Sequence, residues 1–234
     1  MLILALDTAT PTGSVAVLRD GSLAGVLSTS TDETYSSRLF RQLGFLLGEL
    51  SLNVSQFDVF AVAAGPGSFT GLRVGIAAVK GWAEVFGKPI VAVSGLEAVA
   101  AQARFDDKWI ASVLDARRGQ WYAGVYSQSP IGLVLQGKEE VCTPAEILEK
   151  LPKRAGSNGL QYISPSPDTL VRSLAAVQLS GSHGCVIFPA SPVLAPEIAA
   201  IAYNRAKRGE FTDALHLDAN YIRRSDAELL WKGP

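Results

Sequence analysis

The chain has 234 residues, of which 48% are hydrophobic and 18% are charged, so it has ample material for a core and is not a disordered protein. Its formal net charge is −1, which argues against a free-standing binder of nucleic acid or of an anionic membrane, because such binders carry an excess of Lys and Arg. The two cysteines are far apart, no apolar run is long enough for a membrane span, and the apolar start lacks the basic residues of a signal peptide. We therefore expect a soluble protein of the reducing cytoplasm.

The first half of the chain predicts strands and helices in alternation. Apolar runs at 2–6, 14–18 and 23–27 are typical of strands, and Asp20-Gly21 joins the last two as a hairpin. Apolar residues at helical spacing follow over 33–50, then a strand at 57–64, a glycine-rich loop and a helix over 70–86. A short strand at 88–93 leads to Ser94, which forms the pattern of a capping box with Glu97 and opens a helix to about residue 104.

The second half repeats this order. Strands are predicted at 109–114, 120–126 and 133–141, and Thr143-Pro144 opens a helix as N-cap and first helical residue. The run 154–167 is rich in Gly, Ser and Pro and predicts a loop, while 196–208 is an amphipathic helix ended by Gly209. Two copies of strand, Asp-containing turn, strand, strand and helix indicate two related α/β lobes, with a boundary near 104–108.

The loop Gly65-Pro-Gly-Ser-Phe-Thr-Gly-Leu-Arg-Val-Gly75 is the most distinctive motif. It follows a strand and opens a helix, where free N–H groups and small residues suit an anion; Gly65, Gly67, Ser68, Thr70 and Arg73 are the candidate contacts. However, no Lys-Ser or Lys-Thr follows as in a P-loop, and the glycine spacing does not match the dinucleotide fingerprint. The alternative is a tight turn with Ser68 or Thr70 as N-cap and glycines for close helix packing, which the residue types favour.

Asp7 and Asp115 end the two equivalent strands. In two-lobed nucleotide-binding folds such carboxylates hold a metal ion beside phosphate; the alternative is an Asx-turn, and both turns are poor in glycine. The two histidines, His183 and His216, are isolated, so we expect no zinc or iron site and no metal site of its own. No nucleophile elbow is present either, since Ser94 lacks the first flanking glycine. The sequence thus predicts little chemistry.

The helix 70–86 is apolar on nearly all sides, broken by Arg73, Lys80 and Glu84. Such a helix must be covered on more than one side, either wholly within its domain or partly by another protein. Two stripes are candidates for a partner surface. The first helix contributes Tyr35, Leu39, Leu43 and Leu46, and the second contributes Gly71, Leu72, Gly75, Ile76, Val79 and Trp82.

With these residues in view, the chain resembles the TsaB family, also called YeaZ. The resemblance is carried by Ile3-Leu-Ala-Leu-Asp-Thr-Ala-Thr10, the loop 65–75, the turn Asp115-Ala-Arg-Arg-Gly-Gln-Trp-Tyr122 and a weaker Asn220-Tyr-Ile-Arg223. These motifs stand in the family's order and span most of the chain. One departure is Tyr35, where family members often carry His.

The resemblance implies an α/β, actin-like (ASKHA) fold of two ribonuclease-H-like lobes, here residues 1–104 and 105–234. It implies that the chain is a non-catalytic partner of TsaD in a complex that also contains TsaE. That complex forms the threonylcarbamoyl group on N6 of adenosine 37 in tRNAs that read codons beginning with A. The stripes named above would face TsaD or a second copy of the chain, and tRNA would be met indirectly. Asp7 and Asp115 would be relics of an ATPase ancestor, with ATP and Mg²⁺ only at the shared interface.

Two other functions stay open at this point. One is an actin-fold ATPase or sugar kinase that binds Mg-nucleotide through Asp7 and Asp115. The other is a metal-dependent peptidase or carbamoyltransferase like TsaD, for which the sequence lacks ligands. ATP binding by the isolated chain would separate the kinase from the partner.

Overall fold

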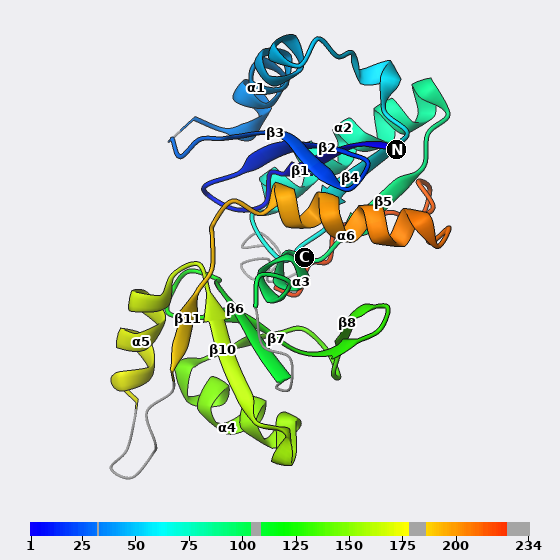
Figure 1. Ribbon diagram of the computed structural model, residues 1–234. Coiled ribbons are helices and arrows are strands. Elements are labelled where there is room, and N and C mark those ends of the chain that lie inside the picture. The colour runs from blue at the N-terminus through cyan, green and yellow to red at the C-terminus, as the bar shows by residue number, and fades with distance from the viewer. Residues whose placement is uncertain (32, 104–108, 178–185, 224–234) are drawn as a thin grey trace, which may run out of the picture.

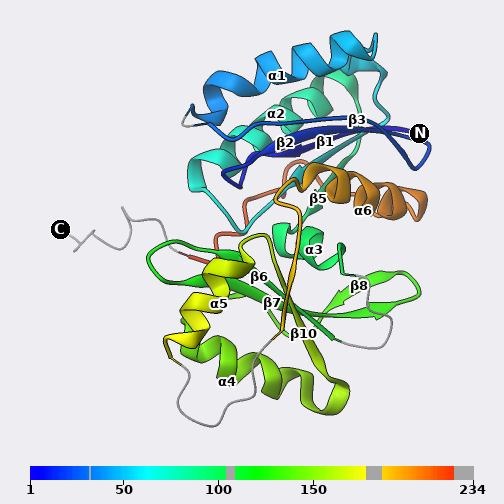
Figure 2. The ribbon, with the colours of Figure 1, turned by 60° about the vertical axis from the view of Figure 1, so that its left-hand side comes forward.

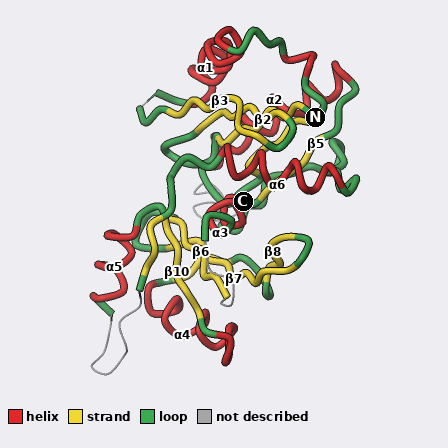
Figure 3. The backbone as a smooth tube through the Cα atoms, viewed as in Figure 1, coloured by secondary structure: helices red, strands yellow, loops and turns green. Residues whose placement is uncertain are grey.

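The computed structural model describes residues 1–31, 33–103, 109–177 and 186–223, and it has two α/β lobes, one above the other in Figure 1. Each lobe is built on one sheet with helices on both faces (Figures 1 and 3). The expectation of two related lobes with an actin-like, ribonuclease-H-like architecture is confirmed by the strand order of the two sheets.

The first sheet has the order β3-β2-β1-β4-β5. Its strands are β1 (Leu2–Asp7), β2 (Ser14–Arg19), β3 (Ser22–Ser28), β4 (Val59–Ala63) and β5 (Ile90–Val93). The first three pair antiparallel as hairpins, and β4 and β5 add in parallel, so that Ile3 faces both Leu18 and Val59. Almost every residue of β1 and β4 is buried, which explains their unbroken apolar runs.

Helices cover both faces of this sheet. Helices α1 (Tyr35–Glu49) and α2 (Phe69–Phe86) pack on one face, where Leu4 and Leu6 of β1 meet Leu39 and Val79. Helix α6 (Ala195–Lys207) packs on the other face, against Ile3 and Ala5. Helix α1 contacts β3 and α2 contacts β4, and Figure 2 shows both helices on the same side of the sheet. Alternate residues of β1 therefore supply two separate cores.

The second sheet has the order β11-β10-β6-β7-β8, which is the first order over again. Its strands are β6 (Trp109–Asp115), β7 (Trp121–Ser129), β8 (Gly132–Leu135), β10 (Leu160–Ser164) and β11 (Ile187–Pro189), with β9 (Glu140–Cys142) paired to β7. Helices α4 (Pro144–Ala155) and α5 (Pro167–Ala175) cover its outer face around Trp121 and Tyr162. By position, α4 and α5 correspond to α1 and α2.

The two inner helices are exchanged between the lobes. Helix α3 (Gly95–Ala100) follows the first sheet but packs on β6 and β7, while α6 follows the second sheet and returns to β1 and β2. The two helices also contact each other, and they form the layer between the sheets (Figure 1). The boundary predicted at 104–105 lies outside the described residues. The return of α6 means that the first lobe, as packed, includes a piece of the C-terminal half.

Three local predictions were wrong. The loop predicted over 154–167 contains β10, because the Gly, Ser and Pro residues only flank a short apolar run around Tyr162 and Ile163. The strand predicted at 133–141 is two strands, β8 and β9, separated by a turn in which Gly137 has a φ of 87°. Ser94 does cap α3, but the Glu97 carboxylate accepts from Arg205 of α6 at 2.8 Å instead of closing a capping box.

Candidate functional site

A cleft of about 930 Å³ lies between the lobes. Its walls are the turn after β1, the loop before α2, the start of α1, and the turn after β6. Three of these segments carry the motifs at 3–10, 65–75 and 115–122 on which the resemblance to the TsaB family was based. The motifs therefore mark the place where residues of both lobes meet. The nucleotide site considered in the sequence analysis would lie in this cleft, since the turns that follow β1 and β6 both line it.

Asp7 is fully buried at the end of β1 and does not reach into the cleft as a free ligand. Its carboxylate accepts from the backbone N–H of Ala9 at 2.9 Å, the N–H of Thr10 at 3.3 Å and the Thr10 hydroxyl at 2.6 Å. Burial raises its pKa, and these hydrogen bonds oppose that rise. The geometry is the Asx-turn foreseen as the alternative to a metal ligand, since three donors already occupy the two oxygens.

Asp115 ends β6 on the opposite wall of the cleft. It is exposed, and its carboxylate accepts the backbone N–H of Arg117 at 2.7 Å. Asp7 and Asp115 therefore take equivalent places in the two lobes, yet each is engaged in its own turn. Nothing in this pairing fits a Mg²⁺ ion held between them, because Asp7 has no access to it.

The loop before α2 is an internal packing element. Ser68 is the N-cap, and its hydroxyl accepts from the N–H of Gly71 at 3.2 Å. A Cβ atom on Gly71 would overlap the carbonyl oxygen of Thr8, and one on Gly75 would overlap the Thr8 hydroxyl. The Thr8 hydroxyl donates to the carbonyl of Gly71 at 2.7 Å. The glycines thus let α2 approach the turn after β1, as the packing interpretation of the loop predicted.

The other candidate anion contacts do not point toward one common place. Gly65 is buried, and its carbonyl accepts from Gly95 at 2.7 Å, while Gly67 and Thr70 line the cleft. The Arg73 side chain turns away toward the C-terminal segment, where its guanidinium stacks 3.8 Å from the Phe69 ring centroid and donates to the Tyr221 hydroxyl at 3.0 Å. The five residues therefore do not form one anion cradle.

Sequence reasoning missed Arg38, which is 2% exposed at the back of the cleft. Its guanidinium donates to the carbonyl and hydroxyl of Thr29 at 3.1 and 3.0 Å and lies 4.0 Å from the Tyr35 ring centroid. Burial raises the pKa of the Tyr35 hydroxyl. The only signal was an Arg three residues after Tyr35, on the apolar side of the predicted helix.

No group of three His, Cys, Asp or Glu side chains that could hold a metal ion occurs within the described residues. His183 lies outside them, and the exposed His216 bonds Asp213 at 2.5 Å. No described helix is long and apolar enough to cross a membrane.

Most of the residues predicted to face a partner point into the first lobe. Nine of the ten are buried, and only Trp82 is partly exposed. The buried ones are Tyr35, Leu39, Leu43, Leu46, Gly71, Leu72, Gly75, Ile76 and Val79. As contact residues they were misassigned, because the strongest apolar stripe of a helix is the one that packs on its own sheet.

The opposite sides of the same helices expose apolar residues beside charged ones such as Arg41 and Glu84. Phe40 is 61% exposed, Phe45 63% and Val85 73%. We define the outer face of α1 and α2 as Phe40, Gly44, Phe45, Gly48, Gly81, Trp82 and Val85. Phe40 and Trp82 meet edge to face with ring centroids 6.4 Å apart, and open space surrounds the Cα of all three glycines. This exposed face, and not the predicted stripe, is available to another molecule.

Comparisons with known proteins agree with this architecture. The family model described as "TsaD: tRNA N6-adenosine threonylcarbamoyltransferase" matches residues 19–209. The tRNA threonylcarbamoyladenosine biosynthesis protein TsaB of Bacillus subtilis is 31% identical over 99% of this chain and 98% of its own length. TsaB of Escherichia coli is 26% identical over 99% of this chain and 97% of its own length.

A solved structure of YeaZ from Pseudomonas aeruginosa superposes with a TM-score of 0.75 at 28% identity, over 94% of this chain and 99% of that one. Another Pseudomonas aeruginosa structure, described as an uncharacterized protein with similarity to peptidase YeaZ, gives 0.77 at 28% identity over 95% and 99%. These matches cover almost the whole of this chain and of each relative, so both lobes are included in the similarity. The chain belongs to the TsaB (YeaZ) family.

Proposed function

We propose that this chain is a non-catalytic partner of TsaD in forming the threonylcarbamoyl group on N6 of adenosine 37 of tRNA. The biological process is taken from the TsaB relatives, whose names place them in threonylcarbamoyladenosine biosynthesis. The role of partner is argued from the chain's own surface and from the state of its cleft.

The outer face of α1 and α2 is the observation that carries the proposal. Phe40, Phe45 and Val85 each expose more than half of their side chain, where a soluble helix usually carries charged or polar groups. Between them Gly44, Gly48 and Gly81 leave room for another backbone to come close. Large exposed apolar groups beside small residues suit a helix-packing interface, which would remove these side chains from water.

The cleft supports the second half of the proposal, the absence of catalysis. The Asp7 carboxylate is buried and accepts three hydrogen bonds from its own turn, and the glycines before α2 are used for packing against Thr8. Of the two carboxylates that line the cleft, Asp115 accepts the N–H of Arg117 and Glu33 forms an ion pair with Arg41. We take ATP and Mg²⁺ to bind only where the complex with TsaD and TsaE forms a shared site.

The same face suits self-association when TsaD is absent. A second copy would present the same helices about a two-fold axis, so that each outer face covers the other. Homodimer and complex would then compete for one surface. Sedimentation of the free chain, with and without TsaD, measures this competition directly.

The proposal is tested by depleting this protein from cells and measuring the threonylcarbamoyladenosine content of their tRNA. We expect the modified nucleoside to fall, and purified TsaD to need this chain for full activity in a reconstituted reaction. Turnover of the isolated chain with ATP, peptide or tRNA, abolished by Asp115→Asn, would contradict the non-catalytic role.

A further inference from the structure

The neck between the two lobes combines an apolar layer with polar contacts that the proposed function does not use. The apolar layer is formed by α3 and α6, which contact each other, and its core includes residues of both sheets, such as Ile3 of β1 and Ile163 of β10. Apolar packing is non-directional and permits small sliding movements of packed helices. Hydrogen bonds are directional, so the polar contacts of the neck decide how the lobes are oriented.

Four side chains form a polar cluster at the neck, with Glu139 at its centre. Glu139 lies in the turn between β8 and β9, in the second lobe. Its Oε1 atom accepts from the hydroxyl of Tyr126 in β7 at 2.5 Å and from the hydroxyl of Ser94. Its Oε2 atom accepts from the side-chain amide of Asn220 at 3.0 Å. Donors from three separate parts of the chain therefore meet on one half-buried carboxylate.

Two of these donors are anchored in the first lobe. Ser94 comes directly after β5. The backbone N–H of Asn220 donates at 2.7 Å to the carbonyl of Ala64, which comes directly after β4. A Cβ atom on Gly65 would lie 2.6 Å from the Asn220 carbonyl oxygen, so this part of the chain packs closely on the loop before α2. Glu139 therefore reaches from the second lobe to the carboxyl ends of β4 and β5.

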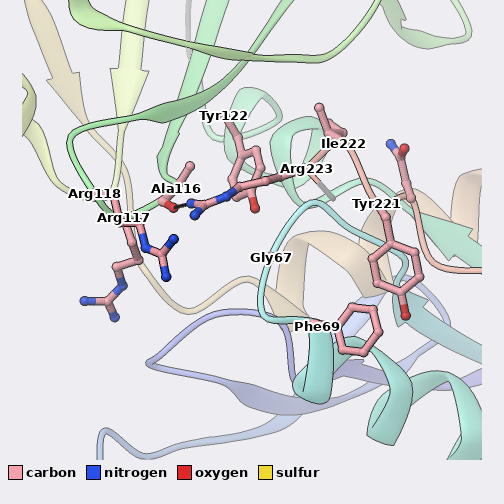
Figure 4. Close-up of a pocket in the computed structure, with 10 residues that line it drawn as sticks. Gly67, Phe69, Ala116, Arg117, Arg118, Tyr122, Tyr221, Ile222 and Arg223 are labelled. Atoms are coloured by element: carbon pink, nitrogen blue, oxygen red, sulfur yellow. Dashed lines mark hydrogen bonds between the residues drawn. The ribbon is translucent and has the colours of Figure 1, made fainter. Parts of the chain in front are cut away.

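The segment that carries Asn220 is itself fixed on both lobes. Figure 4 shows Tyr221 beside Phe69 at the start of α2, and their ring centroids are 4.8 Å apart. The Tyr221 hydroxyl accepts from Nε of Arg73 at 3.0 Å. On the second lobe, Arg223 donates to the carbonyl of Ala116 at 2.8 Å, a bond drawn in Figure 4. The segment thus crosses from one lobe to the other at the polar cluster.

An ion pair near the cluster joins the two helices of the neck. Glu97 of α3 is 9% exposed and accepts from the guanidinium of Arg205 in α6 with both oxygens, each at 2.8 Å. Arg205 also donates to the carbonyl of Ala92 in β5 at 2.9 Å. This pair fixes α3 and α6 to the first sheet, whereas Glu139 joins the second lobe to the first.

We propose that Glu139 is a latch that holds the two lobes at one fixed angle. A hinge or shear motion of one lobe against the other would lengthen the bonds from Ser94 and Asn220, because both donors are anchored in the first lobe. Such a motion would leave half-buried polar groups without partners, which costs free energy. The latch therefore keeps the width of the cleft constant, and it acts in the free chain whether or not TsaD is bound.

The distance between the lobes, measured on the full chain by pulsed electron paramagnetic resonance, tests the latch. Spin labels are attached at Arg19→Cys at the end of β2 and at Asp168→Cys in α5, both exposed positions, after the native cysteines are replaced by Ala. An excess of unlabelled chain ensures that only distances within one chain are recorded. With Glu139 in place we expect one narrow distribution of distances, and Glu139→Ala should broaden it at least about twofold.

A second variant and two controls separate the latch from a general loss of stability. Glu139→Gln keeps the size of the side chain, but its amide nitrogen accepts no hydrogen bond, so it should broaden the distribution less than Glu139→Ala does. Glu149→Ala removes an exposed glutamate of α4 and should leave the distribution unchanged. Leu151→Ala removes part of the core of the second lobe and should lower the Tm without broadening the distribution.

Circular dichroism first establishes that each variant folds, and Glu139→Gln carries the test if Glu139→Ala does not fold. The latch is contradicted if the folded Glu139 variants keep the narrow distribution, or if Leu151→Ala broadens it as much as they do. A broad distribution in the chain that retains Glu139 would contradict it as well. Neither label lies on the outer face of α1 and α2, so the result is separate from whether that face binds TsaD.

Discussion

The corresponding helices of the two lobes carry different residues on their solvent-facing sides. Helices α4 and α5 of the second lobe take the places of α1 and α2 on an equivalent sheet, and both pairs bury one apolar side. The solvent side of α4 carries ion pairs, with Lys150 bonded to Glu146 at 2.6 Å and Lys153 to Glu149 at 2.9 Å. The solvent side of α1 and α2 exposes Phe40, Phe45 and Val85 beside charged residues such as Arg41 and Glu84.

The fold requires the helix sides that pack on the sheets to be apolar, and it places no such requirement on the solvent-facing sides. Both helix pairs cover their sheets, and Phe40 also packs on Trp82, but neither contact requires the large exposed side chains of Phe45 and Val85. The ion pairs of α4 are what a solvated helix of this fold looks like. The apolar outer face of α1 and α2 is therefore an addition to the fold, consistent with a surface that is covered in a complex.

The inner sides of the helices should behave alike in both lobes, and disrupting them should have the largest effect. Leu43→Glu in α1 and Leu151→Glu in α4 each place a charge where the side chain is almost fully buried. We expect each to lower the free energy of unfolding by about 4 kcal/mol or more. Urea denaturation followed by circular dichroism measures this. A tolerated Leu43→Glu would mean that this side of α1 is not core.

The glycines of α2 should divide into two classes. Gly71→Ala places a methyl group on the Thr8 carbonyl oxygen and should destabilise the chain by about 1–3 kcal/mol. Gly81→Ala has open space around it and should stabilise the free chain by about 0.5–1 kcal/mol, while weakening the binding of TsaD if a partner helix comes close there. Thermal unfolding of both variants is the measurement. Equal effects of the two substitutions would contradict the division.

Much of this fold could be predicted from the sequence, and the misassigned surface shows where such reasoning stops. The strands around Leu4 and Val62 were evident because both faces are buried and the apolar runs are unbroken. The periodicity of α1 and α2 was evident too. On helices that are apolar all round, however, periodicity does not tell which side meets the sheet. Leu39 and Val79 were therefore named as partner contacts, and Phe40 and Val85 were not.

The candidate site was predicted in part. The turns at Asp7 and Asp115 and the loop before α2 do meet at one cleft. The contacts of Tyr221 with Phe69 and of Arg223 with Ala116 were not foreseen, because they depend on the last described segment folding back across both lobes. Residues about a hundred positions apart give no local signal of such contact.

The ion pairs of α4 should contribute little to the free energy of unfolding, so their removal should have the smallest effect of the changes considered. The hydrogen bond from Lys150, followed by those from the Thr143 backbone and side chain, lowers the pKa of Glu146 from 4.5 to about 2. A lowered pKa stabilises the fold above pH 4.5, and that stabilisation is lost as the pH falls toward 2.

The Glu146 carboxylate is more than a third exposed, so solvent screening reduces the effect of Glu146→Gln to below about 1 kcal/mol at neutral pH. The stabilities of variant and unaltered chain should converge as the pH falls below 4.5, and urea denaturation at several pH values measures the difference. A larger effect at pH 3 than at pH 7 would contradict the assignment.

The central claim is that the outer face of α1 and α2 binds TsaD, and one binding experiment addresses it. Phe40→Asp and Val85→Asp charge this face without entering the core, and Val171→Asp charges an exposed valine of α5 on the second lobe, 48% exposed, as the control. With folding confirmed by circular dichroism, calorimetric titration of TsaD should show Phe40→Asp and Val85→Asp weakening the complex by roughly thirtyfold or more, about 2 kcal/mol, and Val171→Asp leaving it unchanged. Unaltered affinity in both outer-face variants, or an equal loss in the control, would contradict it.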